Sequence, residues 1–138
     1  MYKIETTTYG FRLTFAGLIT KPEMEQWLKE SQAKLTSAPA SFGVLIDMRT
    51  LVPLAPDVRE DMQSGQALFK KAGMQRSCVV LESSILTYQF KEIAKQSGIY
   101  AFERYVSAST ANWESMAVSW IKHATDPDLI VKAATPKT

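Results

Sequence analysis

The sequence predicts an α/β fold in which an N-terminal β-hairpin is followed by alternating helices and strands, in the order ββαβαβαβα. The stretches "FGVLIDM" and "RSCVVLE" are continuous apolar runs, which is typical of parallel strands covered on both faces. Segments with helical periodicity separate these runs. Because the chain has 138 residues, 46% of them hydrophobic and 22% charged, it suits one globular domain. We therefore expect a five-stranded, mostly parallel mixed sheet with four helices.

The hairpin is predicted from two extended runs, residues 2–8 and 11–19, which flank Tyr9 and Gly10. Glycine supplies the positive φ angle that a tight turn needs. The second run alternates apolar and polar side chains, which is the period-two pattern of a half-buried strand. The apolar side chains on one face of this run are Phe11, Leu13 and Phe15.

The first helix is predicted to begin after Thr20 and to end before Pro39. Thr20 and Glu23 have the spacing of a capping box, in which each side chain binds the backbone N–H of the other residue. Pro22 lies in the first turn, where its missing N–H costs nothing. The residues that share one face of this helix are Met24, Trp27, Leu28, Ser31 and Leu35.

Two further helices are predicted, one after each buried strand. Pro56 begins the first of them and Gly73 ends it, because proline is favoured in a first turn and glycine after a last one. The next helix is capped by Ser83 or Ser84 and stops at Gly98.

The segment "AFERYVSA" is predicted to be the last strand, with an alternation that hides one side. "STANWESMAVSWIKHA" then forms the most amphipathic helix of the chain. We therefore expect one domain over residues 1–124 and a flexible tail over residues 125–138. The tail residues expected to dock on a neighbouring surface are Leu129, Ile130 and Val131.

Composition argues against several classes of function. A formal charge of +2 is too small to indicate a nucleic-acid partner. No apolar stretch is long enough for integral membrane association, and no signal peptide is evident, so a cytoplasmic location is expected. The only cysteine, Cys78, lies in an apolar run and is expected to be buried and structural. The only histidine, His123, lies in the last helix, so neither a metal site nor a catalytic triad is predicted, and no cofactor motif is present.

The remaining candidates are polar residues at the carboxyl ends of the parallel strands, where ligands bind in open α/β sheets. As chemistry, Asp47 and Glu82 form a carboxylate pair in which one pKa is raised. As structure, Asp47 accepts hydrogen bonds from the loop or pairs with Arg49, while the serines cap a helix, and this is the simpler interpretation. The candidates are Asp47, Arg49 and Thr50 after one strand, and Glu82, Ser83 and Ser84 after the next.

The element order, with "GVLIDMRTL" and "CVVLES" each leading into a helix and "FERYVSASTANWESMAVSWI" at the end, resembles the STAS-like, SpoIIAA-like superfamily. The sequence is most similar to small stand-alone bacterial members in which a strand ends in Asp then Arg and the last helix carries a late Trp. The resemblance extends from Tyr2 to about Ala124 and implies a SpoIIAA-like fold.

The resemblance also implies functions. Relatives similar to the sporulation anti-sigma factor antagonist are switched by phosphorylation of a serine in an Asp-Ser-Ser-Gly motif, at the start of the helix after this strand. The corresponding stretch here, Leu51 to Asp61, contains no serine or threonine, and the nearest hydroxyl is that of Thr50. Other relatives look like lipid-transfer domains of the CRAL-TRIO type, which hold an apolar ligand between helices and sheet.

Three hypotheses of function follow. The leading one is a non-catalytic regulatory or binding module that contacts a partner protein or a second copy of the chain through the segment from Arg49 to Gly73. The second is a carrier of a small apolar ligand or lipid between sheet and helices. The third is a hydrolase that uses Asp47, Glu82 or Ser84. The residues expected at the contact surface or pocket mouth are Asp47, Arg49, Thr50, Asp57, Arg59, Ser83 and Ser84, and those expected to line an apolar pocket are Met62, Phe69, Leu86 and Phe90.

Overall fold

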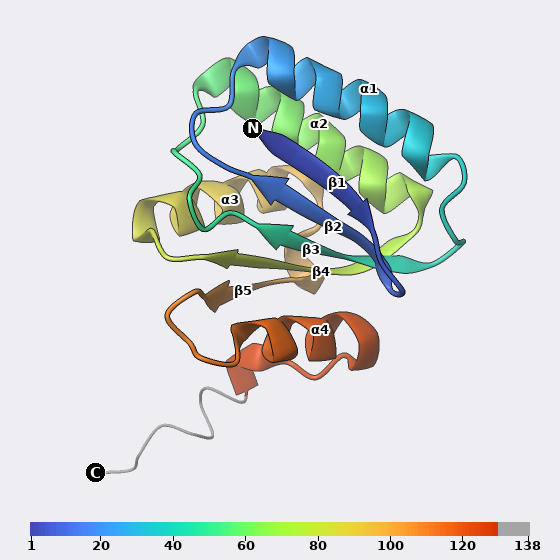
Figure 1. The fold of residues 1–138 in the computed structure, drawn as a ribbon, viewed down its shortest axis with the longest axis vertical. Helices are drawn as coiled ribbons and strands as arrows, with labels where there is room; N and C mark the ends of the chain where they lie inside the picture. The colour runs from blue at the N-terminus through green and yellow to red at the C-terminus, as the bar shows by residue number, and fades with distance from the viewer. Residues whose placement is uncertain (130–138) are drawn as a thin grey trace.

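The fold is a five-stranded mixed sheet with helices on both faces, described over residues 1–129 of a computed structural model (Figure 1). The strands are β1 (Tyr2–Thr6), β2 (Gly10–Phe15), β3 (Phe42–Asp47), β4 (Met74–Leu81) and β5 (Glu103–Ser107). β1 and β2 form the predicted antiparallel hairpin, whereas β2, β3, β4 and β5 run parallel to one another. The strands lie side by side in the order of the sequence.

The helices divide between the two faces of the sheet. They are α1 (Lys21–Leu35), α2 (Pro56–Ala72), α3 (Ser84–Ser97), the short 3₁₀ helix η1 (Tyr100–Phe102) and α4 (Trp113–His123). Helices α1, α2 and α3 cover one face, and α4 packs against β3, β4 and β5 on the other (Figure 1). The predicted fold class is confirmed.

The predicted helix caps are largely confirmed. Thr20 and Glu23 form the capping box, each side chain accepting a hydrogen bond from the backbone of the other. Ser83 rather than Ser84 caps α3, because the Ser83 hydroxyl accepts the N–H of Leu86 at 3.1 Å. The second strand ends at Phe15 rather than at the predicted residue 19, and the chain turns at Gly17, where φ is 65° and a single bridge to Leu51 remains.

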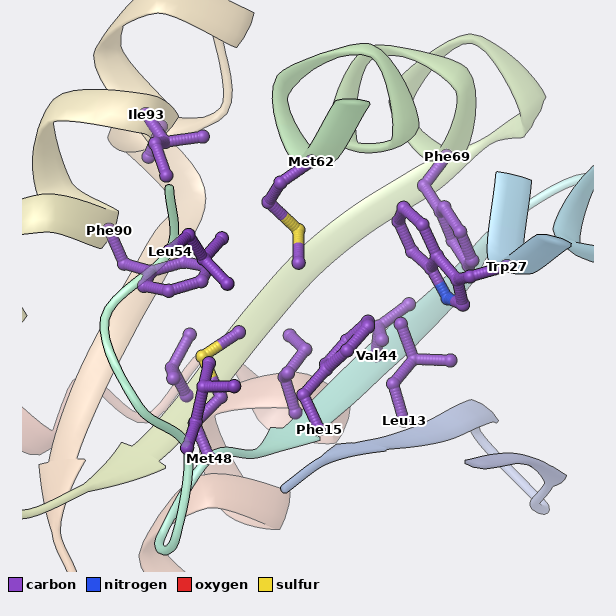
Figure 2. Close-up of a cluster of buried hydrophobic side chains, with 14 of the residues drawn as sticks. Leu13, Phe15, Trp27, Val44, Met48, Leu54, Met62, Phe69, Phe90 and Ile93 are labelled. Atoms are coloured by element: carbon purple, nitrogen blue, oxygen red, sulfur yellow. The ribbon is translucent and has the colours of Figure 1, made fainter. Parts of the chain in front are cut away.

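The sheet separates two hydrophobic cores. In β3, Val44 and Ile46 point to the larger core under α1, α2 and α3, and Leu45 points to the smaller core under α4, because side chains alternate along a strand. Figure 2 shows the larger core, where helix side chains meet those of β2 and β3. Cys78 is fully buried in the smaller core and burial raises the pKa of its thiol, so it is the structural cysteine that the sequence predicted.

Two glycines allow close contacts that no other residue would permit. A Cβ atom at Gly65 of α2 would overlap the six-membered ring of Trp27 in α1. A Cβ atom at Gly43 of β3 would overlap the Cγ2 atom of Ile121 in α4. These positions set how closely α1 packs on α2 and how closely α4 packs on the sheet.

The segment after α4 begins packed on the domain. The Asp126 carboxylate accepts a hydrogen bond from Arg104 Nε at 3.1 Å, and Pro127 is fully buried. Packing therefore extends a few residues past the predicted domain boundary at residue 124. Leu129 is exposed, and the other two predicted docking residues, Ile130 and Val131, lie outside the described residues. Within residues 1–129, no helix combines the length and apolar character needed to cross a membrane.

Candidate functional site

Asp47 and Arg49 form a closed ion pair at the carboxyl end of β3. Oδ1 of Asp47 accepts the backbone N–H of Arg49 at 3.1 Å and its Nε–H at 3.0 Å. Oδ2 of Asp47 accepts a hydrogen bond from Nη2 of Arg49 at 2.8 Å. This two-pronged contact between guanidinium and carboxylate is a strong type of ion pair, and the backbone bond tightens the turn. Both structural roles that the sequence predicted for Asp47 are therefore present.

The pair belongs to a larger group that joins the sheet to the first turn of α4. Arg12 of β2 lies 3.6 Å from Asp47 and forms an ion pair with Glu114 at 2.9 Å. The guanidinium of Arg49 lies over the ring of Trp113, 4.9 Å from its centroid, which is cation–π geometry. We call Arg12, Asp47, Arg49, Trp113 and Glu114 the Asp47 cluster.

The chemistry of Asp47 is that of a fixed anion. Burial favours its protonated form, but hydrogen bonds from Arg49 and the positive charge of Arg12 outweigh burial and keep the pKa of Asp47 below its ordinary value. A carboxylate held in this way is a weak general base.

Glu82 is exposed, and within the described chain it makes no ion pair. The prediction of a raised pKa in an Asp47–Glu82 pair is wrong for Asp47.

Replacing Asp47 by asparagine should lower the free energy of unfolding by about 1 to 2 kcal/mol at pH 7, because it leaves two neighbouring guanidinium groups without their shared anion. Since the pKa of Asp47 is lowered in the folded state, the advantage of the wild type is present above the ordinary carboxyl pKa. It should disappear as the pH falls through the lowered pKa. Urea unfolding at pH 7 and at a series of pH values below 3.8 measures both effects.

The exposed ion pair of Glu92 and Lys95 provides a matched control for the Asp47 variant. Both of its side chains are close to half exposed, so Glu92→Gln should change stability by less than about 0.5 kcal/mol. Equal losses for Asp47→Asn and Glu92→Gln would contradict a special role for the Asp47 cluster.

The other predicted residues near the strand ends stay apart from Asp47. Thr50 and Ser84 are exposed, and Ser83 is used as a helix cap. Asp57 and Arg59 are exposed in the first turn of α2. In the described part of the chain, none of these side chains bonds to Asp47 or Arg49, and no three His, Cys, Asp or Glu side chains gather as a metal-binding group.

Large apolar side chains are exposed at the same edge of the sheet, which sequence periodicity did not indicate. Among residues 1–129, seven large apolar side chains are exposed, and four of them follow the carboxyl ends of β2, β3 and β4. Leu18 is 68% exposed, Val52 47%, and Ile85 70%, and Tyr88 is exposed one turn further along α3. We call these four residues the apolar rim. A sequence signal exists for Val52, which lies in a predicted loop, and for Ile85, which lies at a predicted helix start, whereas Leu18 falls in the second predicted strand and Tyr88 inside a predicted helix.

Hydrogen bonds hold the loops of the apolar rim together. The N–H of Gly17 donates to the carbonyl of Thr50 at 2.9 Å, and the N–H of Val52 donates to the carbonyl of Gly17 at 3.1 Å. The side-chain amide of Gln89 in α3 binds both the N–H and the carbonyl of Leu54, at 2.8 and 2.9 Å. The loops after β2 and β3 and the start of α3 therefore form one connected surface.

The four residues predicted to line an apolar pocket are all buried in the larger core. Figure 2 shows Met62, Phe69 and Phe90 among the side chains of this core. Met62 and Phe69 line a cavity of about 30 Å³ between α2 and the sheet, whereas Leu86 and Phe90 do not contribute to it. Pockets for drug-sized ligands measure roughly 300 to 1,000 Å³. The cavity in this conformation is about the size of one or two water molecules.

A buried carboxyl group that the sequence did not single out lies on β5. Glu103 is 3% exposed, and its carboxyl oxygens accept hydrogen bonds from the Ser77 hydroxyl at 3.0 Å and the Tyr105 hydroxyl at 2.7 Å. Burial raises the pKa of Glu103 to about 7, against the opposing effect of these hydrogen bonds. The sequence analysis predicted that only one face of this strand is buried. In the structure, α4 packs against one face of β5, and Phe90 of α3 contacts Tyr105 on the other.

Comparison with known proteins supports the fold. No protein-family model matches the sequence, and no curated protein matches it. The structure is similar to the crystal structure of an uncharacterised protein of the DUF3478 family, with a SpoIIAA-like fold, from Shewanella loihica PV-4. The TM-score is 0.61 at 14% sequence identity, over 88% of this chain and 92% of that chain. The chain therefore has a SpoIIAA-like fold, as the resemblance in its sequence implied.

Proposed function

We propose that this chain, with its SpoIIAA-like fold, is a non-catalytic binding module that contacts a partner protein through the apolar rim. The observation that carries the proposal is the gathering of exposed Leu18, Val52 and Ile85 at the carboxyl edge of the sheet. Scattered single apolar residues are normal on protein surfaces, whereas several on connected loops are typical of interaction sites.

The charges beside the apolar rim suggest how a partner would be oriented. Arg49 is partly exposed, and Thr50, Asp57 and Arg59 are exposed on the same loop and the following first turn of α2. Interfaces commonly combine an apolar centre with such a polar border. The partner is therefore expected to present an apolar patch bordered by both acidic and basic groups, on a different protein or on a second copy of this chain.

The two other hypotheses have less support. A hydrolase needs a base that is free to accept a proton, and Asp47 is committed to Arg49. A lipid carrier needs the cavity of about 30 Å³ to grow about tenfold. Binding through the surface needs no rearrangement, because hydrogen bonds already hold the rim loops in place.

The single substitutions Val52→Asp and Ile85→Asp should each weaken partner binding or self-association roughly tenfold or more, because each places a carboxylate in an apolar contact. Both side chains are exposed, so the variants should remain folded. Light scattering measures self-association, and quantitative cross-linking in cells measures contact with other proteins.

Tyr100→Asp provides a matched control for the rim variants. Tyr100 is 41% exposed but belongs to η1, which precedes β5 and so lies at the opposite edge of the sheet. Its replacement should leave binding unchanged. If folded Ile85→Asp and Val52→Asp give the same mass and the same cross-linked proteins as the wild type, the proposed surface is wrong.

A further inference from the structure

The outer edge of β5 carries backbone groups that no other strand of the described sheet can reach. β5 lies at one end of that sheet, beside β4 (Figure 1). In a parallel pair, alternate residues turn their backbone groups toward the neighbouring strand. The N–H of Ala108 bonds to the carbonyl of Leu81 in β4, so Tyr105 and Ser107 face away from β4. An edge of this kind can pair with another strand, including the same strand of a second copy.

Some of these outward groups already have partners. Nη1 of Arg104 donates to the carbonyl of Glu103 at 3.1 Å, and the N–H of Thr110 donates to the carbonyl of Ser107 at 3.0 Å. Within residues 1–129, neither backbone group of Tyr105 and not the N–H of Ser107 takes part in a hydrogen bond outside the sheet. The open part of the edge is therefore centred on Tyr105.

Residues 126–128, which follow α4, lie beside this open part, and we call them the edge segment. Asp128 and Tyr105 together line two cavities. One measures about 340 Å³ and includes Met116 of α4, and the other measures about 250 Å³ and includes Lys91 of α3. Pro127 is fully buried and lines the first cavity. The edge segment therefore occupies space that a further strand would need in order to pair with β5.

An ion pair with β5 itself holds the edge segment in place. Nε of Arg104 donates to Oδ1 of Asp126 at 3.1 Å, and the same oxygen accepts the N–H of Asp128 at 2.9 Å. The carboxylate of Asp128 lies 3.9 Å from Arg104. The guanidinium of Arg104 also lies over the ring of Trp120, 4.2 Å from its centroid, which is cation–π geometry. Loss of the Asp126 carboxylate would therefore free the edge segment from a cation that stays fixed on β5.

We propose that the edge segment prevents β5 from pairing with β5 of a second copy of this chain, and that its release allows the two copies to associate. Two antiparallel copies of β5 centred on Tyr105 satisfy each other, because the N–H of Tyr105 in each copy meets the carbonyl of Tyr105 in the other. The contact is the same for both copies, as a twofold dimer requires. It uses the edge of β5 and none of the apolar rim.

Asp126→Lys tests the proposal, because it places a second cation beside Arg104 and should drive the edge segment away from β5. Light scattering of the full chain should then show twice the monomer mass at a concentration roughly tenfold or more below that needed by the parent. Glu25→Lys makes the same change of charge at an exposed position of α1 and should leave the mass unchanged. Both variants are measured in the wild type and in Ile85→Asp, so that association through the apolar rim is recorded separately.

Ser107→Pro identifies the surface that associates. It removes the outward N–H of Ser107, and proline is tolerated on an edge strand where that N–H faces solvent, so Ser107→Pro should make Asp126→Lys monomeric again. Hydrogen exchange gives a second measurement, in which the amides of Tyr105 and Ser107 should exchange more slowly in the associated variant than in its dilute monomer. If Asp126→Lys does not fold, Asp126→Ala takes its place. A folded variant that stays as monomeric as Glu25→Lys, or an association with no added protection at these two amides, would overturn the proposal.

Discussion

Replacing Glu103 by glutamine should stabilise the folded domain by about 3 kcal/mol above pH 7, which is the free energy equivalent of raising the carboxyl pKa from 4.5 to about 7. At that pH the wild type must bury a charged carboxylate with no cation as its partner in the described structure. Glutamine has nearly the same shape and can still hydrogen-bond with Ser77 and Tyr105.

The sign of the pH dependence follows from which state holds the proton. Between pH 4.5 and about 7, the folded chain keeps the proton of Glu103 and the unfolded chain releases it. The stability of the wild type therefore falls as the pH rises through this window and stays lowered above it. Below pH 4.5 the carboxyl group is protonated in both states, so Glu103→Gln should have little effect there.

Urea unfolding of wild type and Glu103→Gln at pH 4, 6 and 8 measures this difference. Glu82→Gln is the control, because Glu82 is an exposed acid and its removal should not alter the pH profile. A Glu103→Gln variant whose stability depends on pH as steeply as that of the wild type, or that is less stable than the wild type at pH 8, would contradict this prediction. The buried carboxyl group would then not be the source of the pH dependence.

Replacing Gly65 by alanine should destabilise the domain by about 2 to 3 kcal/mol, even though alanine favours helix by about 1 kcal/mol. The added Cβ atom overlaps the ring of Trp27, which is fully buried and stacked on Phe69. Because the ring is rigid, α1 and α2 must separate to admit even one methyl group.

Two variants make this prediction specific. Ser64→Ala changes an exposed neighbour on the same helix and should alter stability by less than about 0.5 kcal/mol. Trp27→Phe removes the ring atoms that the new methyl group would overlap, so Gly65→Ala should cost less in that background than in the wild type. Additive effects of the two substitutions in thermal unfolding would contradict the close contact as the cause.

Local patterns in the sequence were sufficient to predict the order of the elements. The continuous apolar run that ends at Asp47 identified β3, and the spacing of Thr20 and Glu23 identified the start of α1. These signals are local, because caps and periodicity depend on residues within a few positions of each other. The Asp47–Arg49 pair was predictable for the same reason, since the two residues lie two positions apart.

Other features required the folded chain. Arg12 and Glu114 are 102 positions apart in the sequence, and only the packing of α4 on β3, β4 and β5 brings them together in the Asp47 cluster. The apolar rim exists because parallel strands bring the loops after β2, β3 and β4 to one edge. The burial of Glu103 likewise depends on elements far away in sequence.

The sequence by itself thus determined the fold class, the starts of α1, α2 and α3 and the local turn at Asp47, because short-range backbone preferences and hydrophobic period control them. The tertiary structure alone decided which charges meet, which apolar residues remain exposed, and that the raised carboxyl pKa belongs to Glu103. Those properties depend on the distance and burial of groups from separate elements, and a linear pattern contains neither quantity.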